Sequence, residues 1–163
     1  MTVREWIDGV SRSGGMCRSY MRRLEAAEGK PGLFRVLCDA NGGRWLFERH
    51  ARGFFVPVDE FMSEFGNYVN GRHVNAYPQG YTSKFYCHRT EPDIDADTTL
   101  VYLLECMDME VYVPKNKYPS IILSEGSQAD VVLGDGAKAN IELYGDARVN
   151  VVGDTTKVRI TKH

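Results

Sequence analysis

The last third of the chain repeats one short pattern at a fixed interval of ten residues. The stretch ADVVL at residues 129–133 recurs as ANIEL at 139–143 and as VNVVG at 149–153. Side chains on a β-strand alternate between two faces, so an even repeat keeps each position on the same face in every unit. Repetition of this kind is typical of architectures in which one unit stacks on the next.

The same interval predicts a series of strands and three inward-facing columns. Strand cores are expected near Val101, Val111, Ile121, Val131, Ile141 and Val151, with a shortened interval before Val158. The expected inward columns are Met109, Pro119, Ala129, Ala139, Val149; Val111, Ile121, Val131, Ile141, Val151; and Val113, Leu123, Leu133, Leu143. Polar residues separate the columns, and the Gly and Asp of tight bends fill the turns.

Two architectures fit this pattern, a parallel β-solenoid and an antiparallel β-meander. In a meander, the small first residue of one unit would meet the bulky last residue of its neighbour. The repeat instead places Ala129 over Ala139 and Leu133 over Leu143, which favours the solenoid, with the meander as the alternative. One ten-residue unit cannot close a coil, because its turn can barely span the length of its own strand. Each coil therefore takes two units, as a two-sided roll, or three.

The first 71 residues predict a bundle of short helices. Val3, Trp6, Ile7 and Val10 lie on one helical face, and Thr2 with Glu5 matches a capping box. Four more apolar faces follow, around Tyr20 and Leu24, Leu33 and Phe34, Leu46 and Phe47, and Phe61 and Phe65. Helices this short must share one core. The fold class is α+β, with a helical lobe over 1–71, an aromatic-rich connector or cap over 72–98, and a repetitive β domain over 99–163.

The connector is dense in aromatic residues, with Tyr77, Tyr81, Phe85 and Tyr86. Such rings stack on bases or sugars, or they cover the open end of a β array. The second interpretation is favoured, because the first layer of a repetitive β array needs a cover.

Composition indicates a folded protein of the cytoplasm. The 163 residues are 43% hydrophobic and 26% charged. Four cysteines are scattered without a CxxC, and the start lacks the pattern of a signal peptide, so reduced thiols are expected. No apolar run approaches the roughly 20 residues that span a bilayer. We expect no membrane association.

One outward strip is a candidate interface. In a two-sided roll, Tyr112, Val132 and Val152 share an outer face, and contiguous apolar strips mark contact sites. The strip could dock on the helices of its own chain or join copies into an oligomer; the sequence leaves both open. Charges near Val158-Arg159-Ile160 blunt the last strand edge, so we expect self-association to run side by side and to close.

A second candidate surface is basic. Residues 1–90 carry 13 Lys and Arg against 9 Asp and Glu. Arg18, Arg22 and Arg23 lie off the apolar face of the second predicted helix, where they would contact phosphate or nucleic acid. The small net charge favours an ordinary solvated face instead.

Motifs for catalysis, cofactors or metals are absent from the sequence. Asp93, Asp95 and Asp97 have EF-hand spacing, but Thr98 and Leu104 replace the Gly and the Glu of a calcium loop. The four histidines show no metal-ligand spacing. No nucleophile motif, P-loop or dinucleotide fingerprint is present. We expect no cofactor, no metal and no enzymatic activity.

The stretch GDGAKANIELYGDARVNVVGD, within residues 99–163, carries a resemblance. A helical head joined to such a tail is similar to small proteins of phages and prophages of gut bacteria. The resemblance implies an accessory or structural protein, located in the bacterial cytoplasm or on the virion. The first hypothesis is a non-enzymatic interaction protein that binds a protein partner or its own copies. The alternative is a nucleic-acid-binding regulator that uses the arginine-bearing helices.

Overall fold

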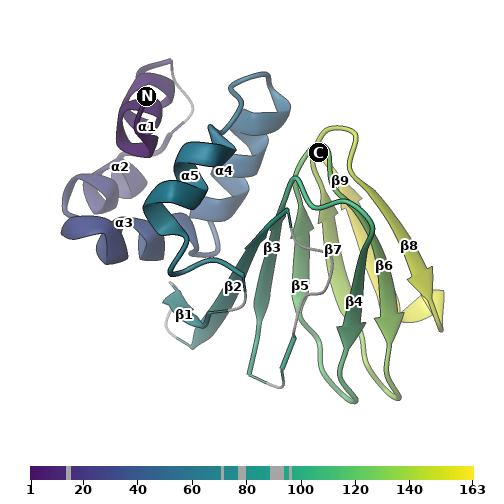
Figure 1. Cartoon of the computed structure of the whole chain (residues 1–163). Coiled ribbons are helices and arrows are strands. Elements are labelled where there is room, and N and C mark those ends of the chain that lie inside the picture. The colour runs from purple at the N-terminus through teal and green to yellow at the C-terminus, as the bar shows by residue number, and fades with distance from the viewer. Residues whose placement is uncertain (14–15, 71, 77–79, 89–93, 96) are drawn as a thin grey trace.

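A computed structural model shows an α+β chain in which five helices precede two β-sheets (Figure 1). It describes residues 1–13, 16–70, 72–76, 80–88, 94–95 and 97–163. Tyr77 of the predicted connector and Asp93 of the aspartate-rich stretch lie outside the described residues.

The five helices are those that the apolar spacing predicts. They are α1 (Val3–Arg12), α2 (Arg18–Glu25), α3 (Gly29–Leu37), α4 (Gly42–Ala51) and α5 (Val58–Phe65). The predicted capping box is confirmed: the amide of Glu5 donates to Thr2 Oγ1, and the amide of Thr2 donates to Glu5 Oε2. In the described part of the chain, no helix has the length and apolar character that crossing a membrane requires.

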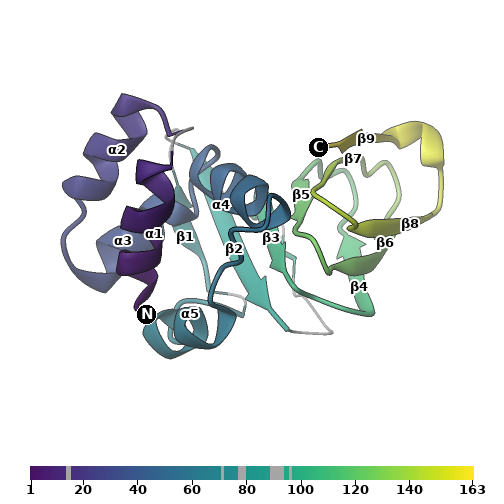
Figure 2. The same cartoon turned by 90° about the horizontal axis from the view of Figure 1, so that it is seen from above.

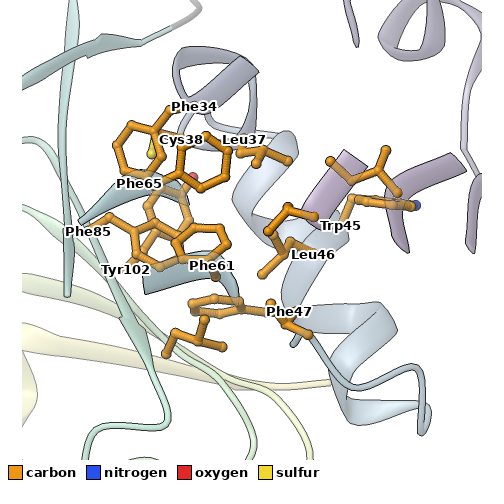
Figure 3. Packing of buried hydrophobic residues seen from close by; sticks show 14 of the residues in the cluster. Phe34, Leu37, Cys38, Trp45, Leu46, Phe47, Phe61, Phe65, Phe85 and Tyr102 are labelled. Carbon is orange, nitrogen blue, oxygen red and sulfur yellow. The ribbon is translucent and has the colours of Figure 1, made fainter. Parts of the chain in front are cut away.

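Aromatic rings fill the core of the helical head. Phe34 of α3 lies 5.3 Å from Phe65 of α5, measured between ring centroids, and Phe61 lies 5.1 Å from Phe85. Phe85 comes from a strand, so the head closes its core partly with a sheet (Figure 3). Short helices become stable through such pooled apolar contacts rather than through their own propensity.

The strands form the predicted parallel β-solenoid. They are β1 (Val74–Ala76), β2 (Tyr81–Cys87), β3 (Leu100–Leu104), β4 (Met109–Val113), β5 (Ser120–Leu123), β6 (Gln128–Leu133), β7 (Ala139–Leu143), β8 (Arg148–Val152) and β9 (Val158–Lys162). One sheet has the order β1-β2-β3-β5-β7-β9, and the other β4-β6-β8. Every pair from β2 onward is parallel, which excludes the antiparallel meander.

Successive units alternate between the two sheets, so each coil holds two units. Val101 pairs with Ile121, and Ile121 pairs with Ile141, one coil further on. Figure 2 shows the two sheets facing each other as a flattened roll. Inward columns meet between them: Val111, Val131 and Ile141 are fully buried, and the partly buried Val151 packs against the same cluster.

The connector supplies two strands to the larger sheet. β2 pairs in parallel with β3, and β1 pairs antiparallel with β2. Tyr86 joins the core of the roll, as the expected cover of its first layer, whereas Phe85 joins the core of the head. Alternate residues of β2 thus serve the two cores.

The head packs on the outer face of the larger sheet. Tyr102 of β3 and Ile122 of β5 are fully buried and belong to the same cluster as the helices. The Tyr102 ring lies 5.8 Å from Phe47 of α4, and its hydroxyl donates to the carbonyl of Asp39. At Gly43 the helix backbone approaches so closely that an added Cβ would lie 2.2 Å from the Tyr102 ring. The contact of α4 with Tyr102 therefore requires glycine at position 43.

Replacing Ile141 with Asp should unfold the roll. The side chain is fully buried in the middle column, and an unpaired charge there costs several kcal/mol. We expect the melting temperature to fall by roughly 10 °C or more. Ile160 is the matched control, because it occupies the next coil of the same column with 47% of its surface exposed. Ile160→Asp should lower the melting temperature much less in thermal denaturation. Equal falls in melting temperature for the two variants would contradict the inward position of Ile141.

Gly43→Ala should loosen the head from the roll. The new methyl group would overlap the Tyr102 ring, and overpacking of this kind costs about 1–3 kcal/mol. Gly9→Ala is the control, since a Cβ at Gly9 of α1 meets no atom within 4 Å and alanine favours a helix. Chemical denaturation should show a loss for Gly43→Ala and no loss for Gly9→Ala. If Gly43→Ala were neutral, the close approach would not limit packing.

Candidate interaction surfaces

The predicted apolar strip lies on the outer face of the three-stranded sheet. Tyr112 of β4 pairs with Val132 of β6, which pairs with Val152 of β8. Tyr112 is 53% exposed and Val152 is 47% exposed, with Val132 half-buried between them. Neighbouring strands lie about 4.8 Å apart, so the strip spans roughly 10 Å. The three side chains form one continuous ridge.

An acidic column runs beside this strip. Glu110, Asp130 and Asn150 occupy the next outward positions of the same three strands and stay in register. All three are exposed. The carboxylates of Glu110 and Asp130 form no salt bridge with any residue that the structure describes, and Asn150 is uncharged. The face therefore combines an apolar ridge with negative charge, which favours a partner with apolar groups flanked by Lys or Arg.

The helices of the chain do not cover the strip. They pack against the outer face of the larger sheet, where Tyr102 and Ile122 are buried, whereas the strip occupies the outer face of the other sheet (Figure 2). Of the two roles left open by the sequence, docking on the chain's own helices is thus wrong. The strip stays exposed in a single chain.

The three arginines of the basic candidate surface have different surroundings. Arg18 and Arg22 of α2 are exposed. Arg23 forms an ion pair with Asp39, which is fully buried. Asp39 Oδ1 also accepts hydrogen bonds from the amides of Asn41 and Gly42, at the start of α4. Arg23 is thereby part of the network that holds α2 against α4, which leaves two arginines on the exposed patch.

A fork between Arg44 and Glu142 joins head and roll, and sequence reasoning missed it. Arg44 of α4 donates from Nε to Glu142 Oε2 at 2.9 Å and from Nη2 to Oε1 at 2.6 Å. Glu142 of β7 is also 3.5 Å from His163 Nε2, through Oε2. The partners are 98 positions apart, and no local pattern relates them. Bidentate pairs of this kind fix orientation as well as position.

The stability of the chain should depend on pH through Glu142. Burial alone would raise the pKa of Glu142, but the hydrogen bonds and charge of Arg44, with His163, outweigh it and lower the pKa. A lowered folded-state pKa adds stability above the unfolded value of about 4.3 and loses it as pH falls through the folded value. Glu142→Gln should therefore cost most near neutral pH and least in acid, in denaturation measured at several pH values. A cost independent of pH would contradict the ion pair.

Other polar clusters serve the fold. Asp95, from the rejected calcium stretch, pairs with Lys84 Nζ at 3.1 Å and with His73 Nε2 at 2.7 Å. Glu105 lies 3.3 Å from His50 Nε2, and His50 Nδ1 accepts from the amide of Val56. Each of these two carboxylates thus pairs with a histidine from another segment of the chain. Within the ranges that the structure describes, no three His, Cys, Asp or Glu residues gather as metal ligands.

No protein-family model, curated protein or solved structure matched this chain. A function for this chain is therefore inferred from its own surfaces.

Proposed function

We propose that this chain is a non-enzymatic interaction protein whose β-roll is a rigid scaffold that presents the Tyr112–Val132–Val152 strip to a protein. The exposure of this in-register apolar ridge, on the face opposite to the head, carries the proposal. Exposed apolar ridges rimmed by polar residues are typical of protein contact sites. An aromatic residue at the edge of the ridge supplies the kind of anchor that contributes most to such contacts.

Rigidity supports the scaffold role. Below the strip, Val111 and Val131 are fully buried, and continuous parallel ladders hold the three strands together. The Tyr112 hydroxyl lies over Gly134, where an added Cβ would be 2.8 Å from its oxygen. A surface that is already ordered loses little conformational entropy on binding. The strip thus suits recognition without rearrangement.

One form of this proposal is self-association of the chain through the strip. This form can be tested on the purified protein without any other partner. Two strips packed face to face would lie about 10 Å apart, as in paired sheets, and would form a closed pair. The resemblance to phage and prophage proteins adds an accessory or structural role, in the bacterial cytoplasm or on the virion. The alternative, a nucleic-acid-binding regulator, has less support, because Arg23 is held by Asp39.

Replacing Val132 and Val152 together with Glu should abolish association without loss of β structure. Both side chains point outward, so the fold tolerates them, whereas two unpaired charges in an apolar contact cost several kcal/mol. Light scattering should show an oligomer for the wild type and a monomer for the double variant, with unchanged circular dichroism.

Asn150→Glu is the matched control, since it adds charge on β8 outside the strip. It should leave the oligomer intact. A wild-type chain that is monomeric at every concentration would contradict self-association, and the double variant would then be compared with the wild type for binding to proteins that carry basic and apolar groups.

A further inference from the structure

A groove crosses the outer face of the larger sheet, beyond the part that the helices cover. Its volume is about 540 Å³, within the range of ligand sites. It lies where β2, β3, β5, β7 and β9 begin, at the lower end of this sheet in Figure 1, and its lining includes Tyr81, Thr99, Tyr118, Ser120, Asn140 and Arg159. Neighbouring strands lie about 4.8 Å apart, so the groove runs roughly 19 Å from β2 to β9. This length suits a chain-like ligand better than a compact one.

Three polar side chains in one row form the floor of the groove. Ser120 of β5 pairs with Asn140 of β7, which pairs with Arg159 of β9. The row points outward, because the next residues of the first two strands, Ile121 and Ile141, are fully buried in the roll. A hydroxyl, an amide and a guanidinium thus follow one another at the spacing of the strands.

Two exposed tyrosines stand one step beyond this row. Tyr118, which is 62% exposed, lies two positions before Ser120. Tyr81 is 40% exposed and lies two positions before Ser83, which belongs to the same row through β3. Side chains two positions apart on a strand share a face, so both rings are on the outer face. Of the rings of the connector, Tyr86 is buried in the roll, whereas Tyr81 stays available for contact.

The end of the groove at β7 and β9 is positively charged. Arg159 forms no salt bridge with any residue that the structure describes. Lys138 and Lys157 each lie two positions before a residue of the floor, and both are exposed. Glu142, the next outward residue of β7, is already neutralised by Arg44. The groove therefore offers rings at one end and unpaired cations at the other.

We propose that this groove binds an acidic oligosaccharide, with sugar rings on Tyr81 and Tyr118 and a carboxylate at Arg159. The C–H faces of sugars pack on aromatic rings. Sugar hydroxyls donate and accept hydrogen bonds, as the side chains of Ser120 and Asn140 do. A carboxylate matches the planar fork of a guanidinium. One sugar unit advances a chain by about the spacing of two strands, so successive units can meet successive strands.

The floor fits a sugar chain better than a nucleic acid. A nucleic acid owes its affinity mainly to several cations that neutralise its phosphates. The row of three holds a single cation beside a neutral hydroxyl and a neutral amide. The inference is independent of the proposed function, because the Tyr112–Val132–Val152 strip lies on the other sheet.

The test uses tetragalacturonate as the probe and its methyl ester as an uncharged counterpart of the same length. In spectra of the ¹⁵N-labelled full chain, tetragalacturonate should shift the side-chain amide signals of Asn140 and the backbone amide signals of Tyr118 and Arg159. The ester should bind about tenfold more weakly, because it lacks the charge-assisted hydrogen bonds. Arg159→Gln should remove most of the difference between the two probes. Arg148→Gln, the same change at an exposed position of β8 on the other sheet, should preserve it.

Tyr118→Ala tests the contact with the sugar rings. It should weaken the binding of both probes by about tenfold, and the melting temperature should stay unchanged because the ring is largely exposed. Phe55→Ala is the control, since Phe55 is 60% exposed and lies on the head outside the groove. It should leave the binding of both probes unchanged.

Four results would overturn the proposal. Neither probe could shift any signal of the groove at millimolar concentration. The ester could bind as tightly as the acid, which would remove the acidic part. Folded Tyr118→Ala could bind as the wild type does, which would place the sugar elsewhere. Tetrathymidylate could bind more tightly than tetragalacturonate, which would replace the sugar with single-stranded nucleic acid. The comparisons of probes on the wild type do not depend on any variant folding.

Discussion

The contact of Tyr102 with the first turn of α4 is the constraint on which the rest of the structure depends. Its ring lies against the backbone of Gly43, and its hydroxyl donates to the carbonyl of Asp39. The side chain of Asp39 in turn holds the amides that begin α4 and the guanidinium of Arg23. One tyrosine of the roll thereby fixes the helix that lines the aromatic core of the head. Because a buried polar group without a partner is costly, the loss of one of these contacts would weaken the others.

This contact also makes the two outer faces of the roll unequal. A ten-residue repeat gives both sheets an outward column that holds apolar residues, Tyr102 and Ile122 on one side and Tyr112 and Val132 on the other. Helices bury the first column and leave the second exposed. The exposed strip is thus what remains when a symmetric repeat is covered on one side only. Its exposure reflects the arrangement of the fold rather than an isolated apolar substitution.

The regular spacing of apolar residues allowed the fold to be predicted from the sequence. It gave no information on contacts between residues that are far apart in the chain. The columns through Val131 and Ile141, and the helix faces around Trp6 and Phe61, follow from local periodicity, which decides what is buried. Which face of the roll the head would cover has no periodic signal. It depends on Gly43 and on the Arg44–Glu142 fork, whose members are far apart in the chain.

Arg44 contributes to the junction between head and roll through every nitrogen of its guanidinium. All three nitrogens of its guanidinium donate, Nε and Nη2 to Glu142 and Nη1 to the carbonyl of Ala40. Removing this guanidinium would leave the nearly buried carboxylate of Glu142 without its main partner, which is costly. The fork thus orients the head on the roll and also neutralises a nearly buried carboxylate.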